Sequence, residues 1–336
     1  METPNDKNAN VTRLTVGALI VSVVLTVVKF VGWRVTMSQA VYSDFLESIV
    51  NIVAGIMAIF VVRYAAKPAD RDHPYGHGKI EYFSAAFEGG LIAFAALMIF
   101  FEAFPILFEP RALDQLGVGA AIVFGCGVAN LILGTWLKRV GRRVGSPAIV
   151  ANGEHIVSDF YTSAGVTAGL IIASITGLSW IDPLVAILVG AQLGWTGLRV
   201  VRHSVGGLLD EEDVAFLRDF SKALSRVDFG GVIQVHRVRI MRSGRYHHID
   251  AHVVVPEFWD VAEAHDRTEK FEERLLAEYP QPGDLRFHID PCRRAYCRHC
   301  DVPNCPIRRH PFEKRLKVDF ESMIGPEYPS ESVQKV

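Results

Sequence analysis

The sequence has little charge for its length and no excess of either sign. Charged residues make up 21% of the 336 residues, and the formal net charge is −2. This balance gives no indication of nucleic-acid binding, and we expect no nucleic-acid partner. The chain also lacks an HExxH helix, which argues against a zinc hydrolase of that type. Cysteine is scarce, with five residues.

Long apolar runs are what the sequence has in abundance. Hydrophobic residues make up 50% of the chain and the mean hydropathy is +0.22, which is unusual for a soluble protein. Six runs approach or exceed the roughly 17 to 25 residues that a helix needs to cross hydrocarbon. They cover residues 13–33, 40–64, 82–107, 116–138, 148–177 and 181–203. The pattern predicts a multi-pass α-helical membrane protein.

Basic residues gather in alternate connections between these runs. They are Arg63, Lys67, Arg71 and Lys79 between spans two and three, Lys138, Arg139, Arg142 and Arg143 between four and five, and Arg199 and Arg202 at the end of span six. The other connections hold only Arg34 and Arg111. The positive-inside rule therefore predicts that both termini lie in the cytoplasm.

Residues 208–291 are mixed in polarity and contain no run long enough to span a membrane. Their pattern predicts helices over 210–227 and 259–280, two strands within 231–255 joined at Ser243-Gly244, and a strand over 284–290. The order αββαβ indicates a small α+β domain, ferredoxin-like or metallochaperone-like, with helices on one face of a sheet. We expect a cytoplasmic tail (1–12), a membrane domain (13–206), a cytoplasmic α+β domain (208–291) and a cysteine-rich tail (292–336).

Two predicted spans carry polar side chains at helical spacing. His155 and Asp159 lie four residues apart in span five, and Glu47 and Asn51 do so in span two. Asp44, one turn before Glu47, is a further candidate ligand or proton carrier. Residues at i and i+4 share one helix face. Ionisable groups within a membrane usually mark an ion path, so we expect the two pairs to form one metal site. The alternative is that they only hydrogen-bond and lock the helices together.

The donor set favours Zn²⁺ and leaves Fe²⁺, Mn²⁺ and Co²⁺ open. Glu47 and Asp159 would neutralise a divalent cation, which would in turn neutralise two carboxylates that hydrocarbon disfavours. The loop "PADRDHPYGHGKIE" (68–81) offers a second set, Asp70, His73 and His77. Its glycines allow the backbone to fold these side chains towards one ion, although a solvated basic loop is equally compatible with the pattern.

Four of the five cysteines, Cys292, Cys297, Cys300 and Cys305, fall in "PCRRAYCRHCDVPNC". A disulfide framework is not expected in the reducing cytoplasm. The spacing favours a tetrahedral Zn²⁺ site over a tail with free thiols.

The stretches "RYAAKPADRDHPYGHGKIE" and "HIVSD", six spans and an αββαβ tail resemble the cation diffusion facilitator family over about residues 12–292. The resemblance implies a homodimeric divalent metal/proton antiporter of the cytoplasmic (inner) membrane, not an enzyme. It also implies a regulatory and dimerisation role for the domain at 208–291. It places the transport site on Glu47, Asn51, His155 and Asp159 and a loop site on Asp70, His73 and His77. It places further metal sites in the soluble domain on His236, His252, His288 and Asp290, with His265 as an additional candidate. On residue pattern alone these are partly buried strand histidines.

The span-two pair departs from the family, whose well-known members have two aspartates, or a histidine and an aspartate, at these positions. Metal preference is therefore not copied from relatives. The sequence predicts proton-coupled export of a divalent transition metal, with Zn²⁺ first. A membrane-anchored metal sensor without flux and a membrane metalloenzyme are the alternatives.

Overall fold

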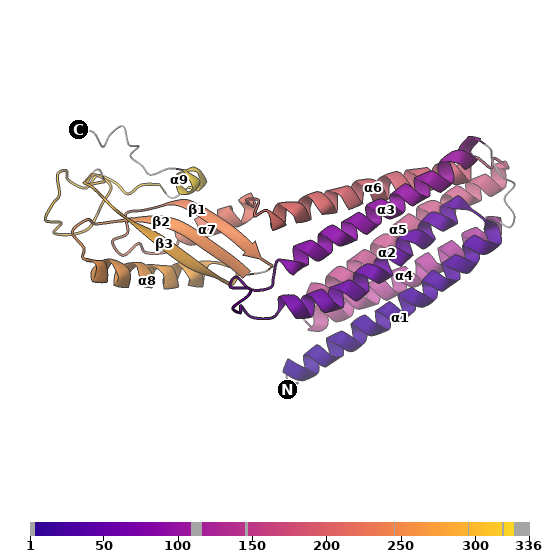
Figure 1. Ribbon diagram of the computed structural model, residues 1–336, viewed down its shortest axis with the longest axis horizontal. Helices are drawn as coiled ribbons and strands as arrows, with labels where there is room; N and C mark the ends of the chain where they lie inside the picture. Colours follow the sequence, from indigo (N-terminus) through magenta and orange to yellow (C-terminus); the bar gives the residue numbers. More distant parts are fainter. Residues whose placement is uncertain are drawn as a thin grey trace. The chain divides into compact units, whose positions relative to one another are not determined.

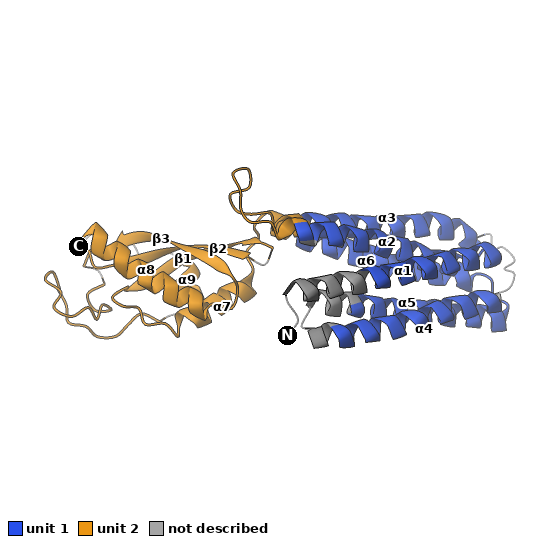
Figure 2. Ribbon diagram, turned by 90° about the horizontal axis from the view of Figure 1, so that it is seen from below, with its two compact units in different colours: residues 1–63, 83–205 blue, residues 64–82, 206–336 orange. Residues whose placement is uncertain are grey.

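The computed structural model describes residues 4–108, 116–144, 147–244, 246–294, 296–317 and 319–325, without the side chains of residues 4–15, 58, 62, 116, 141–152 and 154. The start of the predicted N-terminal tail, the side chains of Arg111, Arg142 and Arg143, and residues 326–336 of the predicted cysteine-rich tail lie outside this description. Residues 1–63 and 83–205 form one compact unit, and residues 64–82 and 206–336 form a second (Figure 2). The loop after the second span thus groups with the second unit.

The first unit is a bundle of long helices (Figure 1). They are α1 (Pro4–Thr36), α2 (Gln39–Ala65), α3 (Ile80–Phe108), α4 (Leu116–Val144), α5 (Pro147–Thr176) and α6 (Ile181–Leu208). In the described part of the chain, six helices are long and apolar enough to cross a membrane. Large apolar side chains such as Phe101 (74% exposed) and Ile175 (80%) lie on the outside of the bundle, where lipid would cover them. The predicted six-span architecture is confirmed.

Two features hold neighbouring helices close together. A Cβ added to Gly89 of α3 would lie 2.8 Å from the carbonyl oxygen of Gly197 on α6, so these helices approach backbone to backbone. Asp182, fully buried in the first turn of α6, accepts hydrogen bonds from the backbone N–H groups of Gln39 (2.7 Å) and Ala40 (3.2 Å). This carboxylate satisfies the free N–H groups at the start of α2 and fixes that helix end in the bundle.

The second unit contains α7 (Val214–Leu224), β1 (Gln234–Ser243), β2 (Tyr246–Val255), α8 (Val261–Glu278), β3 (Gly283–Pro291) and the short α9 (Phe320–Ile324). The sheet order is β1-β2-β3, with an antiparallel first pair and a parallel second pair. Its core joins Phe220 of α7 and Phe271 of α8 to Ile249, Ala251 and Val253 of β2. The predicted αββαβ domain is confirmed. The helix α9 was not predicted; Asp319 and Ser322 form its capping box.

Candidate functional site

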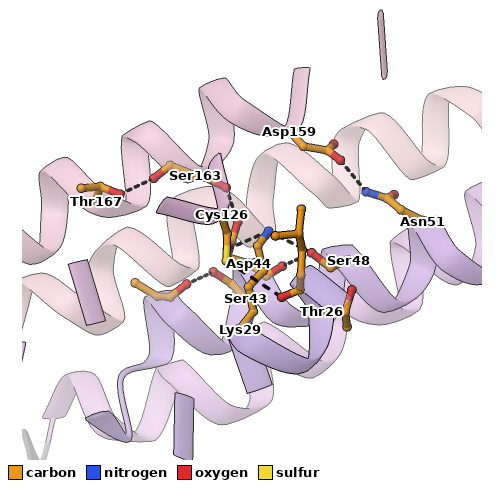
Figure 3. Close-up of polar contacts among 12 residues, drawn as sticks. Thr26, Lys29, Ser43, Asp44, Ser48, Asn51, Cys126, Asp159, Ser163 and Thr167 are labelled. Carbon is orange, nitrogen blue, oxygen red and sulfur yellow. Dashed lines mark hydrogen bonds and ion pairs between the residues drawn. The ribbon is translucent and has the colours of Figure 1, made fainter. Parts of the chain in front are cut away.

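Helices α2 and α5 bring their polar side chains together inside the bundle. The Asn51 Nδ2 group donates a hydrogen bond to Asp159 Oδ2 at 3.1 Å (Figure 3). His155, one turn earlier on α5, lines the same cavity of about 60 Å³, together with Asn51, Asp159 and Ser48. A space of this size holds a water molecule or a bare cation and excludes organic substrates.

Glu47 is not among the residues that line this cavity. It is half-buried and near enough to Asp159 and Asp44 for their charges to interact. Among the described residues, this cluster does not gather three ligand atoms within 4.8 Å of one another. The structure therefore brings three of the four predicted transport ligands to one cavity and leaves the fourth close by.

Lys29 of α1, which was not predicted to be part of the site, completes the cluster. Lys29 of α1, 2% exposed, forms an ion pair with Asp44 (Nζ to Oδ2, 2.9 Å) and donates to Ser48 Oγ at 2.9 Å (Figure 3). Asp44 also accepts a hydrogen bond from Ser163 Oγ of α5 at 2.7 Å. Both oxygens of Asp44, which is predicted as a candidate metal ligand, thus already have partners. The sequence does contain an indication of this role, because Lys29 is a charged residue within an otherwise apolar run.

The loop after α2 forms a compact set of ligand atoms. Asp70, His73 and His77 offer ligand atoms within 4.8 Å of one another. Asp70 Oδ1 accepts the His73 backbone N–H at 2.8 Å, and Asp70 Oδ2 lies 3.4 Å from His77 Nε2. The backbone N–H of His73 is the main cause that holds the pKa of Asp70 below its ordinary value. His77 is buried, and its Nδ1 has no hydrogen-bond partner. A metal ion would satisfy this donor set.

Close backbone contact holds this loop against the sheet. A Cβ at Gly78 would lie 2.1 Å from the backbone oxygen of Ser243, at the end of β1. Nearby, Lys79 forms an ion pair with Asp210 at 2.9 Å. Only glycine fits at residue 78 without displacing backbone.

We expect Gly78→Ala to shift the loop and to weaken metal binding at Asp70, His73 and His77 by about 5- to 150-fold, since 1.4 kcal/mol corresponds to a factor of ten. The clash involves backbone and costs about 1 to 3 kcal/mol. Isothermal titration with Zn²⁺ measures the loss. Gly90→Ala is the matched control, because nothing lies within 4 Å of the added carbon. Unchanged binding in both variants would contradict this role for the close contact.

The sheet aligns three histidines across its strands. His236 pairs with His252, and His252 pairs with His288. Asp290 Oδ2 lies 2.9 Å from His252 Nδ1 and 3.3 Å from His236 Nε2, and its Oδ1 lies 3.6 Å from His288 Nε2. The neighbours of His252 in β2, Ala251 and Val253, point into the core, so the histidines occupy the opposite face.

His236 shows why this set fits a metal ion. Its side chain is 1% exposed, and neither ring nitrogen makes a hydrogen bond. Burial is the main cause that lowers its pKa from 6.5 to about 4, despite the nearby charge of Asp290. A neutral buried imidazole with free nitrogens is ready to bind a metal. His265 is exposed on α8 and does not join this group.

The buried His236 predicts a loss of stability in acid when no metal is bound. Its folded-state pKa is depressed, so the unfolded chain binds its proton first. Stability therefore falls as the pH drops from about 6.5 towards 4, by about 3 kcal/mol in total. Thermal unfolding of the metal-free chain across this range measures the slope. His236→Asn should flatten it, and an equal slope in both proteins would contradict the assignment.

The cysteine segment folds against the sheet. Cys292, Cys297 and Cys300 are buried, Cys305 is half-buried, and all four are free thiols. Burial raises the pKa of Cys292 and of Cys300. The described cysteines do not bring three sulfur atoms within 4.8 Å of one another.

Comparisons with known proteins decide the family. Residues 15–209 match the model described as the cation efflux transmembrane domain, and residues 213–292 match the cytoplasmic domain of cation efflux proteins. The chain belongs to the cation diffusion facilitator family. It is 34% identical over 300 residues to the uncharacterized transporter sll1263 of Synechocystis, covering 88% of this chain and 95% of that protein. It is 31% identical over 271 residues to the cation-efflux pump FieF of Serratia proteamaculans and to that of Yersinia pestis, covering 80% of this chain and 89% of each pump.

Family membership makes the chain a multi-pass membrane transporter that exports metal cations. It favours export over the sensor and the metalloenzyme that the sequence left as alternatives. The segment from residue 293 onward lies beyond both family models.

Proposed function

We propose that this transporter exports a divalent transition metal in exchange for protons, with Zn²⁺ first and Fe²⁺, Mn²⁺ and Co²⁺ as further candidates. The observation that carries the proposal is the cavity where Asn51 of α2 meets His155 and Asp159 of α5. Imidazole, carboxylate and amide donors suit this class of ion. Glu47 supplies the remaining ligand from α2.

The charges around the cavity support a dication as cargo. Asp44, Glu47 and Asp159 are three carboxylates, and Lys29 is paired with the first of them. Two carboxylate charges therefore remain, which match one divalent cation. The ion pair explains why Asp44 can be present without a role as a ligand; its proposed role is to compensate the charge of Lys29.

Exchange with protons follows from the chemistry of the ligands. Imidazole and carboxylate must lose their protons to bind a metal, so binding releases protons and protonation releases the metal. A site exposed in turn to two compartments then couples metal movement to proton movement. We place the transporter in the inner membrane with both termini in the cytoplasm, the orientation that the positive-inside rule predicts. The inward proton gradient across that membrane then drives metal outward.

The two sets of ligands in the second unit are proposed to hold resident ions. Asp70, His73 and His77 would hold one in the loop, and His236, His252, His288 and Asp290 would hold metal on the sheet. The free ring nitrogens of His77 and His236 support this role. Bound metal would cross-link neighbouring strands through their side chains. We propose that this domain also joins two copies of the chain into a homodimer, as the family resemblance implies.

Flux measured in proteoliposomes tests the proposal. We expect external Zn²⁺ to enter vesicles that contain the purified chain and to acidify the outside as lumenal protons leave. Dissipating the pH gradient with an ionophore should slow Zn²⁺ entry, whereas protein-free vesicles show neither signal. Zn²⁺ entry that is insensitive to the pH gradient would contradict proton exchange.

A further inference from the structure

The cysteine segment is packed against the sheet face that carries the histidines. Val254 is two residues from His252 and shares its face, and it forms an apolar cluster with Cys292, Tyr296 and Cys300. The Tyr296 hydroxyl donates a hydrogen bond (2.8 Å) to the side chain of Gln234, which lies two residues before His236. The four cysteines are thus part of a folded element beside the histidine cluster.

A backbone N–H group points at the sulfur atom of Cys297. The N–H of Arg309 lies 3.3 Å from Cys297 Sγ. Donors aimed at sulfur stabilise a thiolate and contribute little to a neutral thiol, because charge-assisted hydrogen bonds are the strong ones.

One arginine fixes the turns between the cysteines. The Arg308 guanidinium donates to the backbone oxygens of Cys297 (3.1 Å), Cys300 (2.9 Å) and Val302 (2.7 Å). Arg293, Arg294 and Asn304 adopt positive φ angles of 45°, 61° and 54°. Such conformations are costly for residues other than glycine and persist where the surrounding structure requires them. The turns are therefore held in place around the cysteine positions.

We propose that Cys292, Cys297, Cys300 and Cys305 bind one structural Zn²⁺ as a four-thiolate site that fastens this segment to the sheet. Thiolates with the spacing x4, x2, x4 match tetrahedral zinc coordination, with Zn–S distances of about 2.3 Å. This geometry requires sulfur atoms about 3.8 Å apart, so the four thiols approach one another when the ion binds and their protons leave. The site is separate from the transport cavity and from the two ligand sets made of histidine and aspartate.

Co²⁺ substitution tests the site, because only thiolate ligands give intense near-ultraviolet charge-transfer bands with this ion. We expect the full chain, reduced and then loaded with Co²⁺, to show these bands and to lose them when Zn²⁺ is added. The variant Cys297→Ser with Cys300→Ser should lack them. Cys126→Ser, which removes the isolated thiol of α4, should retain them. No charge-transfer bands in the full chain would overturn the proposal.

Two further measurements on the unmodified chain keep the test decisive if the double variant does not fold. Zn²⁺ should slow alkylation of the half-buried Cys305, read by mass spectrometry, relative to the same chain in EDTA. An equal rate with and without Zn²⁺ would contradict the site.

The second measurement is analysis of the purified chain for iron and acid-labile sulfide. Finding both would overturn the zinc proposal in favour of an iron–sulfur cluster, since the x4, x2 spacing also occurs in ferredoxins. Both readouts are independent of flux, so the transport proposal stands or falls separately.

Discussion

Asp159→Ala is expected to reduce metal transport to the level of protein-free vesicles. The substitution removes a carboxylate that lines the cavity and accepts the Asn51 hydrogen bond, and it leaves one unpaired carboxylate charge for a divalent ion. Loss of groups that merely orient a metal ligand costs about 10- to 100-fold, so loss of a ligand should cost more than about 100-fold. Initial rates of Zn²⁺ entry into proteoliposomes measure the effect.

The control is Glu102→Gln, which removes an exposed carboxylate on α3, away from the cavity. It should transport at the rate of the unchanged chain. Zn²⁺ binding by His236, His252 and Asp290 should survive in both variants, because the second unit has its own core. Transport by Asp159→Ala at more than a tenth of the normal rate would show that the assigned cavity is not the path.

Lys29→Met is expected to destabilise the helix bundle strongly. It leaves the Asp44 carboxylate, 1% exposed, without its partner. Removing one member of a buried ion pair costs about 3 to 5 kcal/mol, because the remaining charge is uncompensated. The melting temperature in detergent and the yield of monodisperse protein should both fall.

The double variant Lys29→Met with Asp44→Asn separates charge from shape. Replacing both members of a buried pair by neutral groups is often neutral or stabilising. We therefore expect the double variant to recover most of the lost stability. Asp44→Asn alone should behave like Lys29→Met, since it leaves the charge of Lys29 without its partner. A double variant as unstable as either single one would mean that the two residues contribute independently of their contact.

The apolar runs made the membrane bundle predictable in outline. Hydrocarbon forces each span to satisfy its backbone internally, so run length translates directly into helices. The ends were less predictable: α1 begins at Pro4, whereas its apolar run begins at residue 13. Polar residues can extend a helix beyond the hydrocarbon, and the length of an apolar run does not predict this extension.

The candidate sites were predictable where the spacing of residues along one helix or strand decides which side chains share a face. His155 and Asp159 share a face because they lie four apart in one helix. The histidine row on the sheet depends instead on the register of three strands, including the irregularity between His236 and Arg239. Residue pattern alone does not specify such register, and only the family resemblance predicted that these residues form metal sites. The contact between Lys29 and Asp44 likewise depends on how two helices pack.

We propose that α2 and α5 share one divalent ion. The decisive measurement is anomalous diffraction from crystals of the Zn²⁺-loaded chain, collected above and below the zinc absorption edge. We predict a peak coordinated by His155 and Asp159 from one helix and by Glu47 and Asn51 from the other. Strong zinc peaks on the loop and the sheet, with none between these two helices and with Glu47 and His155 turned apart, would contradict the account.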